Sequence, residues 1–340
     1  MSAPLFKIRE NGKFGFINAE GSMVIEPQYL GAEDFYNGFS RVRFNDRLVH
    51  LDSMGRLLLK HPFNFVGFFE EGLARVQLVS RWGYIDIRGN LSIEIQYEAA
   101  GDFSGGLAPV RHHGYYGYIR ADGSWAIRPE FENAREFSSG LAPACLAGKW
   151  GYIDEEGGLA IVPQFDGCSA FQAEVAFVQE GQLWGLINRP GELLVEPQFE
   201  FLEGYASGEF SDGMAIVIQD GLFGFINEAG ELVVEPAFAF AGDFGDGLSP
   251  GQLHNRFGYI NKSGELSIPP RFEDAGLFTD ELAPVKTNGY WGFIDKDGEW
   301  RIPPKYEACL PFRSGLALVI KAGKWLYLSK EGEVVWEEFT

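Results

Sequence analysis

The sequence predicts an all-β protein built as a tandem array of about ten three-stranded β-meanders, each about 34 residues long. Three observations predict it: a motif that recurs every 34 residues, glycine turns at fixed places in each repeat, and aromatic and β-branched residues at strand-like spacing. The 340-residue chain contains 44 Gly and 30 Phe, a composition typical of many turns between short strands. With 46% hydrophobic residues it can bury a large core.

The repeat is defined by a glycine that follows an aromatic residue in most copies, as in "WGYID" at 150–154. We call this position the register glycine. The step between successive copies is 34 residues, except for 39 residues between Gly185 and Gly224, and worn copies have Val49 and Leu326 at this position. The register glycines are Gly15, Gly83, Gly117, Gly151, Gly185, Gly224, Gly258 and Gly292. Ten repeats in phase decide the fold class.

Each repeat contains a turn with the pattern Asx-x-x-Gly. Glycine stands six residues after the register position in all ten copies, from Gly21 to Gly332, and Asn or Asp stands three residues after it in eight copies. An Asx side chain caps backbone N–H groups and glycine takes the position with positive φ. The turn joins a strand such as 150–154 to one such as 159–163.

Two further predicted strands complete the repeat. A strand such as "GLAPV" at 106–110 precedes the register strand, and the strand after the Asx turn contains proline, as at Pro163, which indicates a sheet edge. A Phe column from Phe35 to Phe312 lies in the connections, where we expect it to fill the seam between neighbouring meanders. Because every repeat contains several glycines and most contain a proline, the sequence argues against the helical tetratricopeptide repeat of the same length.

We expect a single array over residues 1–340. The predicted repeats span 3–34, 39–68, 72–102, 106–136, 140–170, 174–209, 213–243, 247–277, 281–311 and 315–340. Each has room for three strands, whereas propeller blades usually have four strands in about 40–45 residues. The chain starts with a first strand at 5–8 and ends inside a third strand, so no strand is left to close a ring. The prediction is an open, twisted superhelix or solenoid, with a closed or two-lobed propeller as the alternative.

The columns W/F-G-F/Y-I-D/N-x-x-G, I-x-P-x-F/Y and F-x-x-G-L-A-x-V resemble the bacterial WG-repeat family. The resemblance runs from Phe14 to Trp336 and departs from the pattern mainly at Leu48-Val49 and Leu326, with Tyr or Phe replacing Trp at Tyr116, Phe223 and Phe257. It implies a β-repeat array used mostly for interaction. Some members of the family resemble accessory or immunity partners of secreted toxins.

The net charge of the chain limits the classes of partner that it can bind. The 28 Lys and Arg residues and 48 Asp and Glu residues give a net charge of −20. This disfavours nucleic acid and anionic membranes, which attract clustered cations, and favours a basic partner. The same charge also suits an ordinary soluble cytosolic protein. There is no apolar run of about 18 residues and no apolar signal segment at the start, so we expect a cytoplasmic protein.

Residues that could carry chemistry mostly align with structural columns. Cys168 and Cys309 stand where other repeats have Ala, and Cys145 has no nearby His or Asp in sequence. Trp125 and Trp300 share an apolar column, so core is expected, with surface contact as the alternative. The Asx residues alternate between Asp and Asn, which favours turn caps over calcium ligands. We therefore expect no catalytic residue, cofactor or metal site.

Two irregular features are the candidates for partner binding. His112 and His113 occupy a turn in the fourth repeat without the spacing of a metal site, so a surface contact is expected. The five-residue excess near 203–213 adds Tyr205 and Glu209 to the candidates, because insertions in repeat arrays map to loops.

The sequence favours a non-enzymatic protein-interaction scaffold whose acidic surface engages a protein partner that is itself basic. An immunity or adaptor protein of a bacterial toxin system fits that description. A module that binds glycan or peptidoglycan fragments through aromatic side chains is the alternative. An enzyme with residues assembled across repeats is disfavoured, since nearly every candidate side chain belongs to a structural column.

Overall fold

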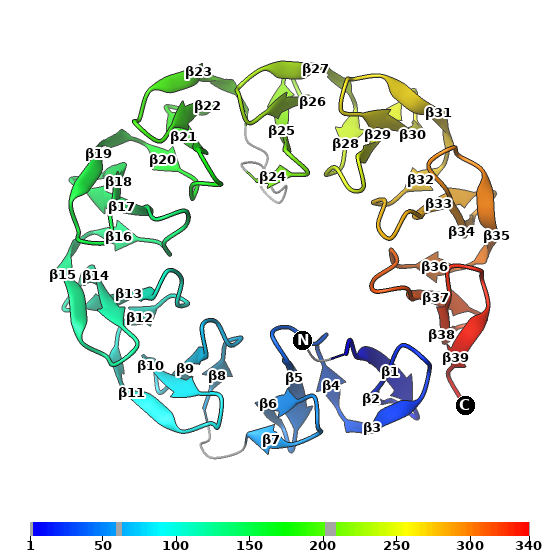
Figure 1. The fold of residues 1–340 in the computed structure, drawn as a ribbon, viewed down its shortest axis with the longest axis horizontal. Helices are drawn as coiled ribbons and strands as arrows, with labels where there is room; N and C mark the ends of the chain where they lie inside the picture. The colour runs from blue at the N-terminus through cyan, green and yellow to red at the C-terminus, as the bar shows by residue number, and fades with distance from the viewer. Residues whose placement is uncertain (1–2, 59–62, 201–208, 340) are drawn as a thin grey trace. The chain divides into compact units, whose positions relative to one another are not determined.

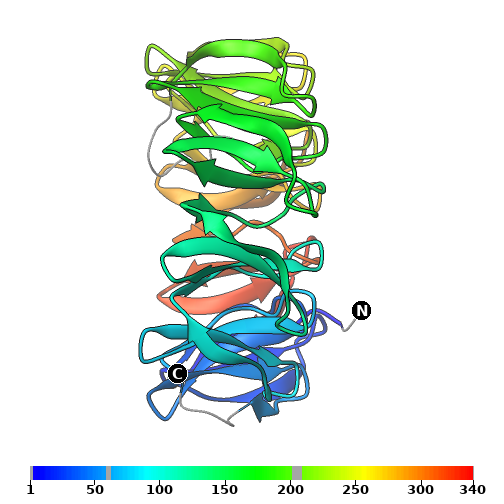
Figure 2. The ribbon, with the colours of Figure 1, turned by 90° about the vertical axis from the view of Figure 1, so that its left-hand side faces the viewer.

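The structure is a computed structural model that describes residues 3–58, 63–200 and 209–339. In this part of the chain it is all-β, and its 39 strands form ten small antiparallel sheets (Figure 1). We call these sheets blades 1–10 in chain order. Blade 1 has three strands and each other blade has four, hydrogen-bonded in the order in which they follow along the chain. Figure 2 shows the twist of the blades.

The strands take four positions in a blade, and blade 1 lacks the first. The first, short strands are β4 (Gly31–Ala32), β8 (Phe65–Val66), β12 (Ala99–Ala100), β16 (Asn133–Ala134), β20 (Gly167–Cys168), β24 (Phe210–Ser211), β28 (Phe240–Ala241), β32 (Asp274–Ala275) and β36 (Ala308–Cys309). The second strands are β1 (Phe6–Glu10), β5 (Phe39–Phe44), β9 (Leu73–Leu78), β13 (Leu107–His112), β17 (Ala142–Leu146), β21 (Val175–Glu180), β25 (Met214–Gln219), β29 (Leu248–Leu253), β33 (Ala283–Thr287) and β37 (Ala317–Lys321).

The register glycines lie in the third strands, and the proline column that includes Pro163 lies in the fourth. The third strands are β2 (Lys13–Ile17), β6 (Arg47–Asp52), β10 (Arg81–Asp86), β14 (Tyr115–Arg120), β18 (Lys149–Ile153), β22 (Leu183–Asn188), β26 (Leu222–Asn227), β30 (Arg256–Asn261), β34 (Tyr290–Ile294) and β38 (Lys324–Leu328). The fourth are β3 (Met23–Tyr29), β7 (Leu57–Leu58), β11 (Leu91–Tyr97), β15 (Trp125–Phe131), β19 (Leu159–Phe165), β23 (Leu193–Phe199), β27 (Leu232–Phe238), β31 (Leu266–Phe272), β35 (Trp300–Tyr306) and β39 (Val334–Glu337).

The prediction of three strands per repeat is wrong, because the connection contributes a short fourth strand. In blade 5, β16 pairs with β17 through Ala134 and Ala144. The same two-residue pairing recurs in the other four-stranded blades except blade 7, where β24 pairs with the first two residues of β25. A four-stranded sheet per repeat is the architecture of a propeller blade.

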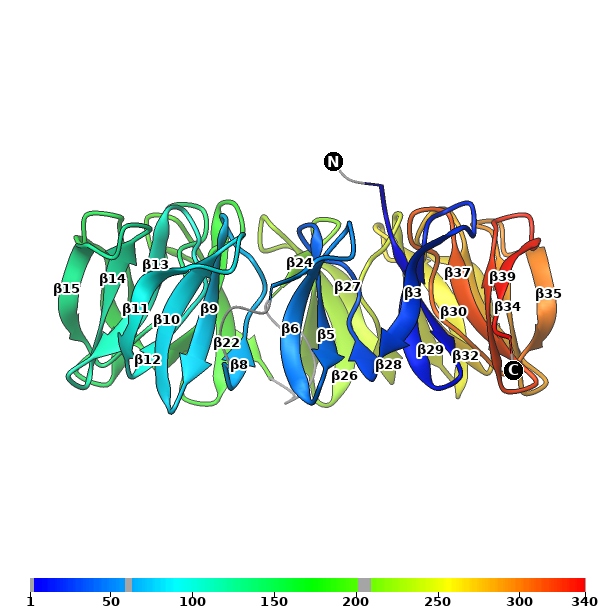
Figure 3. The same cartoon turned by 90° about the horizontal axis from the view of Figure 1, so that it is seen from below.

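The two turns of each blade have the geometry that their residues favour. The hairpin between second and third strands is a two-residue turn with positive φ, as at His113 (52°) and Gly114 (88°), which matches the twist of the strands. The Asx turn is confirmed: Asp154 Oδ1 accepts hydrogen bonds from the N–H groups of Gly158 (2.7 Å) and Glu156 (3.1 Å). Figure 3 shows the antiparallel strands β9, β10 and β11 that these turns connect.

The register glycine lets the fourth strand cross the third at close range. In blade 5, Trp150 pairs with Phe165 and Tyr152 with Ile161, so the fourth strand bulges opposite Gly151. A Cβ on Gly151 would collide with the carbonyl oxygen of Ile161. Blade 10 has Leu326 instead, and there the fourth strand is only four residues long and pairs Leu326 directly with Glu337.

The core lies in the seams between consecutive blades. The fully buried Tyr152 ring of blade 5 packs edge-to-face on Phe171 (4.7 Å between centroids), and its hydroxyl donates to the carbonyl of Ser169 (2.8 Å). Both partners lie between β20 and β21 of blade 6. The cluster around Tyr152 also takes Ala176 and Val178 from blade 6, so one seam draws on two blades. The same ring pair recurs at Tyr84–Phe103, Tyr118–Phe137, Phe225–Phe244, Tyr259–Phe278 and Phe293–Phe312.

The prediction of an open superhelix is also wrong, and the propeller alternative is closer. The Asx-turn glycine of each blade contacts the fourth strand of the blade before it, as Gly157 contacts Ile127. Gly21 of blade 1 makes the corresponding contact with Val335 in blade 10. In an open array, no Asx-turn glycine would contact the fourth strand of the last blade. The prediction failed because it required an exchanged strand for closure, whereas this contact needs only a turn.

Contacts divide the chain into two compact units. The first comprises Met1–Asn18, Met23–Gly181 and Leu186–Leu193, and the second comprises Ala19–Ser22, Gln182–Gly185 and Leu194–Thr340. The turn around Gly21 therefore belongs to the same unit as blade 10. Among the described residues, no helix is long and apolar enough to cross a membrane.

Replacing Gly151 with Ala tests the close crossing of strands. We expect G151A to lower the free energy of unfolding by about 3 kcal/mol, because the added methyl group meets backbone that cannot move without breaking the sheet. Chemical denaturation measures this loss. G31A is the matched control, since a Cβ at Gly31 lies at an ordinary 3.6 Å from Arg43, and it should change stability by no more than about 0.5 kcal/mol. Equal losses in the two variants would contradict the crossing argument.

Blade 2 predicts a specific acid sensitivity, because His50 takes the place of the buried tyrosine. Its Nε2 lies 2.5 Å from the carbonyl oxygen of Gly67, and burial lowers the His50 pKa from 6.5 to about 4. The unfolded chain therefore binds a proton at a higher pH than the folded chain does, and stability falls as the pH drops from about 6.5 to about 4.

We expect H50Y, which restores the residue of this column, to remove up to about 3 kcal/mol of that acid-induced loss. Denaturant unfolding at pH 8 and pH 5 measures it. The exposed His254 supplies a control, H254N, which should leave the pH dependence unchanged. A pH dependence that H50Y also leaves unchanged would show that His50 is not the cause.

Candidate binding surfaces

Many of the acidic side chains have structural roles in turns. Glu132 Oε2 accepts a hydrogen bond from the N–H of Gly148 in the hairpin of blade 5 (2.8 Å). Equivalent carboxylates cap the hairpins of other blades, namely Glu98, Asp166, Glu200, Glu273 and Glu307. The negative charge therefore does not by itself mark a binding surface.

A second set of acids connects consecutive blades. Asp280 Oδ2 accepts from the N–H of Gly315 (2.7 Å), and the matching contacts from Asp212 and Asp246 reach Gly247 (2.8 Å) and Glu281 (2.7 Å). Hydroxyl groups at the neighbouring position bridge the same turns, as Ser138 donates to the carbonyl of Phe171 (2.6 Å). These contacts link each blade to the next along one row of turns.

A row of glutamates on the fourth strands has no such role. Five blades place Glu eleven residues after the register position, and all five side chains are exposed: Glu26, Glu94, Glu196, Glu235 and Glu337. Within the described part of the chain, none of them has a hydrogen bond or an ion pair. Glu196 and Glu235 belong to consecutive blades in the second compact unit. This row is a repeated set of acidic side chains that are not engaged in turns.

Blade 4 carries a groove of about 560 Å³ on the side chains of its second to fourth strands. We call it the blade 4 groove. The hairpin end of β13 and β14 contributes one wall and the start of β15 contributes the other. Its lining residues are His112, His113, Tyr115, Trp125, Ala126, Arg128 and Pro129. No carboxylate is among them, although the chain has 48 acidic residues.

The aromatic rings of the blade 4 groove pack on one another and on the core beneath them. The His112 ring lies 4.1 Å from that of His113 and 5.9 Å from that of Trp125 (centroid distances). Trp125 packs edge-to-face on Tyr97, which is only 2% exposed and belongs to the core of the preceding seam. Tyr115 is 51% exposed. The groove is thus an exposed aromatic surface on a rigid base.

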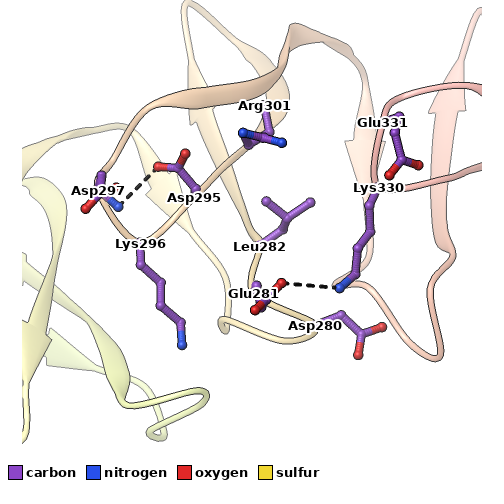
Figure 4. A pocket seen from close by; sticks show the side chains of 9 residues that line it. All are labelled: Asp280, Glu281, Leu282, Asp295, Lys296, Asp297, Arg301, Lys330 and Glu331. Atoms are coloured by element: carbon purple, nitrogen blue, oxygen red, sulfur yellow. Dashed lines mark hydrogen bonds and ion pairs between the residues drawn. The ribbon is translucent and has the colours of Figure 1, made fainter.

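A second depression, of about 410 Å³, lies between the turns of blades 9 and 10 and is shown in Figure 4. Charged side chains of both signs line it, namely Asp280, Glu281, Asp295, Lys296, Asp297, Arg301, Lys330 and Glu331. Several are already engaged: Asp280 and Asp295 cap turns, and Lys330 lies 3.7 Å from Glu281. This mixture of engaged charges favours no single ligand.

The structure places the predicted site residues in different surroundings. His112 and His113 lie side by side in the blade 4 groove. Glu209 is exposed directly before β24, and Tyr205 lies outside the described residues. The assignment of these four residues to partner binding stays a prediction. Sequence reasoning missed Tyr115 and Arg128, although both depart from the residues that are usual in their columns.

The cysteines have the chemistry of buried core residues. Burial raises the pKa of the Cys168 thiol to about 11 and that of Cys309 to about 12, so both are protonated near neutral pH. Cys145 is also buried, and burial raises its thiol pKa. In the described part of the chain, no group of three His, Cys, Asp or Glu residues is placed to hold a metal ion.

The difference between capping and free carboxylates is testable. We expect D154A to lower stability by about 1 kcal/mol, because two backbone N–H groups lose their acceptor. D154N should retain most of the stability, since Asn188 and Asn227 cap the same turn in other blades. E196Q, in the free row, should stay within about 0.5 kcal/mol of the parent. Thermal and denaturant unfolding measure all three, and a loss in E196Q as large as in D154A would refute the distinction.

Comparison with known proteins assigns the repeat. A crystal structure of the eukaryotic initiation factor matches with a TM-score of 0.53 at 11% identity, covering 99% of this chain and 96% of that one, which supports the fold alone. The structure of Kluyveromyces lactis Hsv2p matches with a TM-score of 0.35 at 10% identity, covering 68% of this chain and 92% of that one. The dihydro-heme d1 dehydrogenase NirN matches with a TM-score of 0.41 at 12% identity, covering 99% of this chain and 74% of that one. No curated protein matches the sequence.

The family model described as "WG containing repeat" matches nine segments that together cover nearly the whole chain. They are residues 14–47, 51–78, 82–116, 116–150, 150–184, 184–223, 223–252, 257–291 and 291–325. Eight of the nine segments contain a register glycine, and all nine contain the glycine of the turn that follows it. The chain belongs to the WG-repeat family.

Proposed function

We propose that this protein is a non-enzymatic interaction scaffold whose acidic surface binds a basic protein partner. A β-propeller built from repeats is consistent with such a role, because it presents equivalent surface positions on successive rigid blades. The engaged turn carboxylates and the protonated thiols of Cys168 and Cys309 leave few candidate groups for catalysis. An adaptor or an immunity partner of a toxin, acting in the cytoplasm, fits this proposal.

The observation that carries the proposal is the row of free glutamates. A carboxylate that caps a turn already has its hydrogen-bond donors, whereas Glu196 and Glu235 present unpaired charge on neighbouring fourth strands. Exposed like charges on a rigid frame attract a partner of opposite charge and steer its approach. Fourth-strand prolines such as Pro197 and Pro236 remove backbone donors from the same edges, so side chains rather than strand addition would make the contact.

Charge reversal in the row tests the proposal. We expect E196K/E235K to lose most of its capture of basic host proteins in a pull-down quantified by mass spectrometry. Capture by the parent should fall as ionic strength rises from about 0.1 M to about 1 M, because salt screens exposed charges.

The matched control is E174K/E228K, which changes the net charge equally at exposed acids outside the row. It should retain capture. Equal losses in both double variants would indicate a net-charge effect, and capture that is indifferent to salt would overturn the electrostatic proposal.

A further inference from the structure

Blade 4 departs from the repeat at several positions that converge in its groove. His112 stands in a variable column in which three other blades have Leu and no other blade has His, and the column of Trp125 is otherwise mostly leucine. Tyr115 takes a position held by Lys or Arg in six blades. These residues belong to different columns of the repeat, yet all of them line the blade 4 groove. Packing of the repeat does not require them, since the other blades fold with the ordinary residues.

The charge of the blade 4 groove is opposite to that of the molecule. Arg128 occupies the position of the free glutamates, so it reverses the charge of the row at this blade. Among the described residues, its guanidinium group has no hydrogen bond or ion pair. With two histidines beside it and no acid in the lining, the groove is suited to an anion.

The residues that line the groove favour a ligand with a ring over an extended peptide. Trp125 and Tyr115 offer apolar faces, and Trp125 is braced by Tyr97 at 6.0 Å between centroids. Pro129 removes a backbone N–H from the edge of β15 at the groove itself, which weakens strand addition by an extended peptide. Aromatic faces with a few convergent polar groups are typical of small-ligand sites.

We propose that the blade 4 groove binds a saccharide that carries a carboxylate, such as a uronic acid or an N-acylated sugar acid. The apolar face of the sugar ring packs on Trp125 and Tyr115. The Arg128 guanidinium pairs with the carboxylate, and the imidazoles of His112 and His113 hydrogen-bond to hydroxyl groups. This site is independent of the glutamate row and of the protein partner proposed above.

Isothermal titration calorimetry of the full chain tests the site with four probes: glucuronic acid, N-acetylmuramic acid, and their neutral counterparts glucose and N-acetylglucosamine. We expect at least one acid to bind at least about tenfold more tightly than its neutral counterpart, because a charge-assisted contact is lost in the latter. R128E and W125L install residues that other blades already have at these positions, and each should weaken binding of the acid by about tenfold or more.

Two controls separate the groove from the rest of the surface. W300L makes the same change in the same column of blade 9 and should leave binding unchanged. An acetylated Glu-Tyr-Glu peptide amide supplies the same charge and an aromatic ring without sugar. Equal, negligible heats for all four sugars would overturn the proposal, as would binding that survives R128E. Binding of the peptide alone would reassign the groove to an acidic protein segment.

Discussion

The seam between two blades depends on one aromatic pair. A single three- or four-stranded sheet has two faces and too little area to bury both, so each blade is stable only against its neighbours. Tyr152 of blade 5 meets this constraint with its ring on Phe171 and its hydroxyl on the carbonyl of Ser169, both in the segment that joins β20 to β21 in blade 6. One side chain thereby fixes the core contact and the path of the connection. The recurrence of the pair explains why the Phe column persists where Trp and Gly columns vary.

This constraint separates structural residues from free ones. The aromatic, glycine and Asx columns, and most carboxylates in turns, are engaged in the blade or its seams. What remains is the outer position of the fourth strand and the hairpin end, where side chains vary without cost to the fold. The free glutamates and the blade 4 groove both lie at these positions. Binding properties can therefore differ from blade to blade on one unchanged frame.

Much of the fold could be predicted from the sequence because its causes are local. The spacing of Gly151 and Gly157 and the Asp154 cap identify two strands and their turn without any tertiary information. The two-residue strand β16 was missed because Asn133 and Ala134 have no strand pattern of their own, and their pairing depends on β17 already being in place. Closure onto blade 10 was missed because it rests on the turn around Gly21, not on a strand.

The candidate site was predictable only in part for a related reason. His112 and His113 are visible as an unusual dipeptide in the sequence. Trp125 and Arg128 are brought close to them only when β13, β14 and β15 pair into one sheet. Comparing each residue with its own column, rather than reading motifs, is the signal that would have found Arg128. A charge that is ordinary in isolation becomes informative when five equivalent positions carry the opposite sign.

The hydrogen bonds that Asp212, Asp246 and Asp280 accept come from backbone N–H groups 35 residues further along the chain, always in the corresponding turn of the next blade. Each repeat thus brings one acceptor and one donor for this row. Inserting or removing a whole repeat would leave every acceptor with a donor, whereas inserting part of one would not. Duplication in steps of one blade would therefore preserve this row of contacts, although the contact between Gly21 and Val335 would have to form again with the new number of blades.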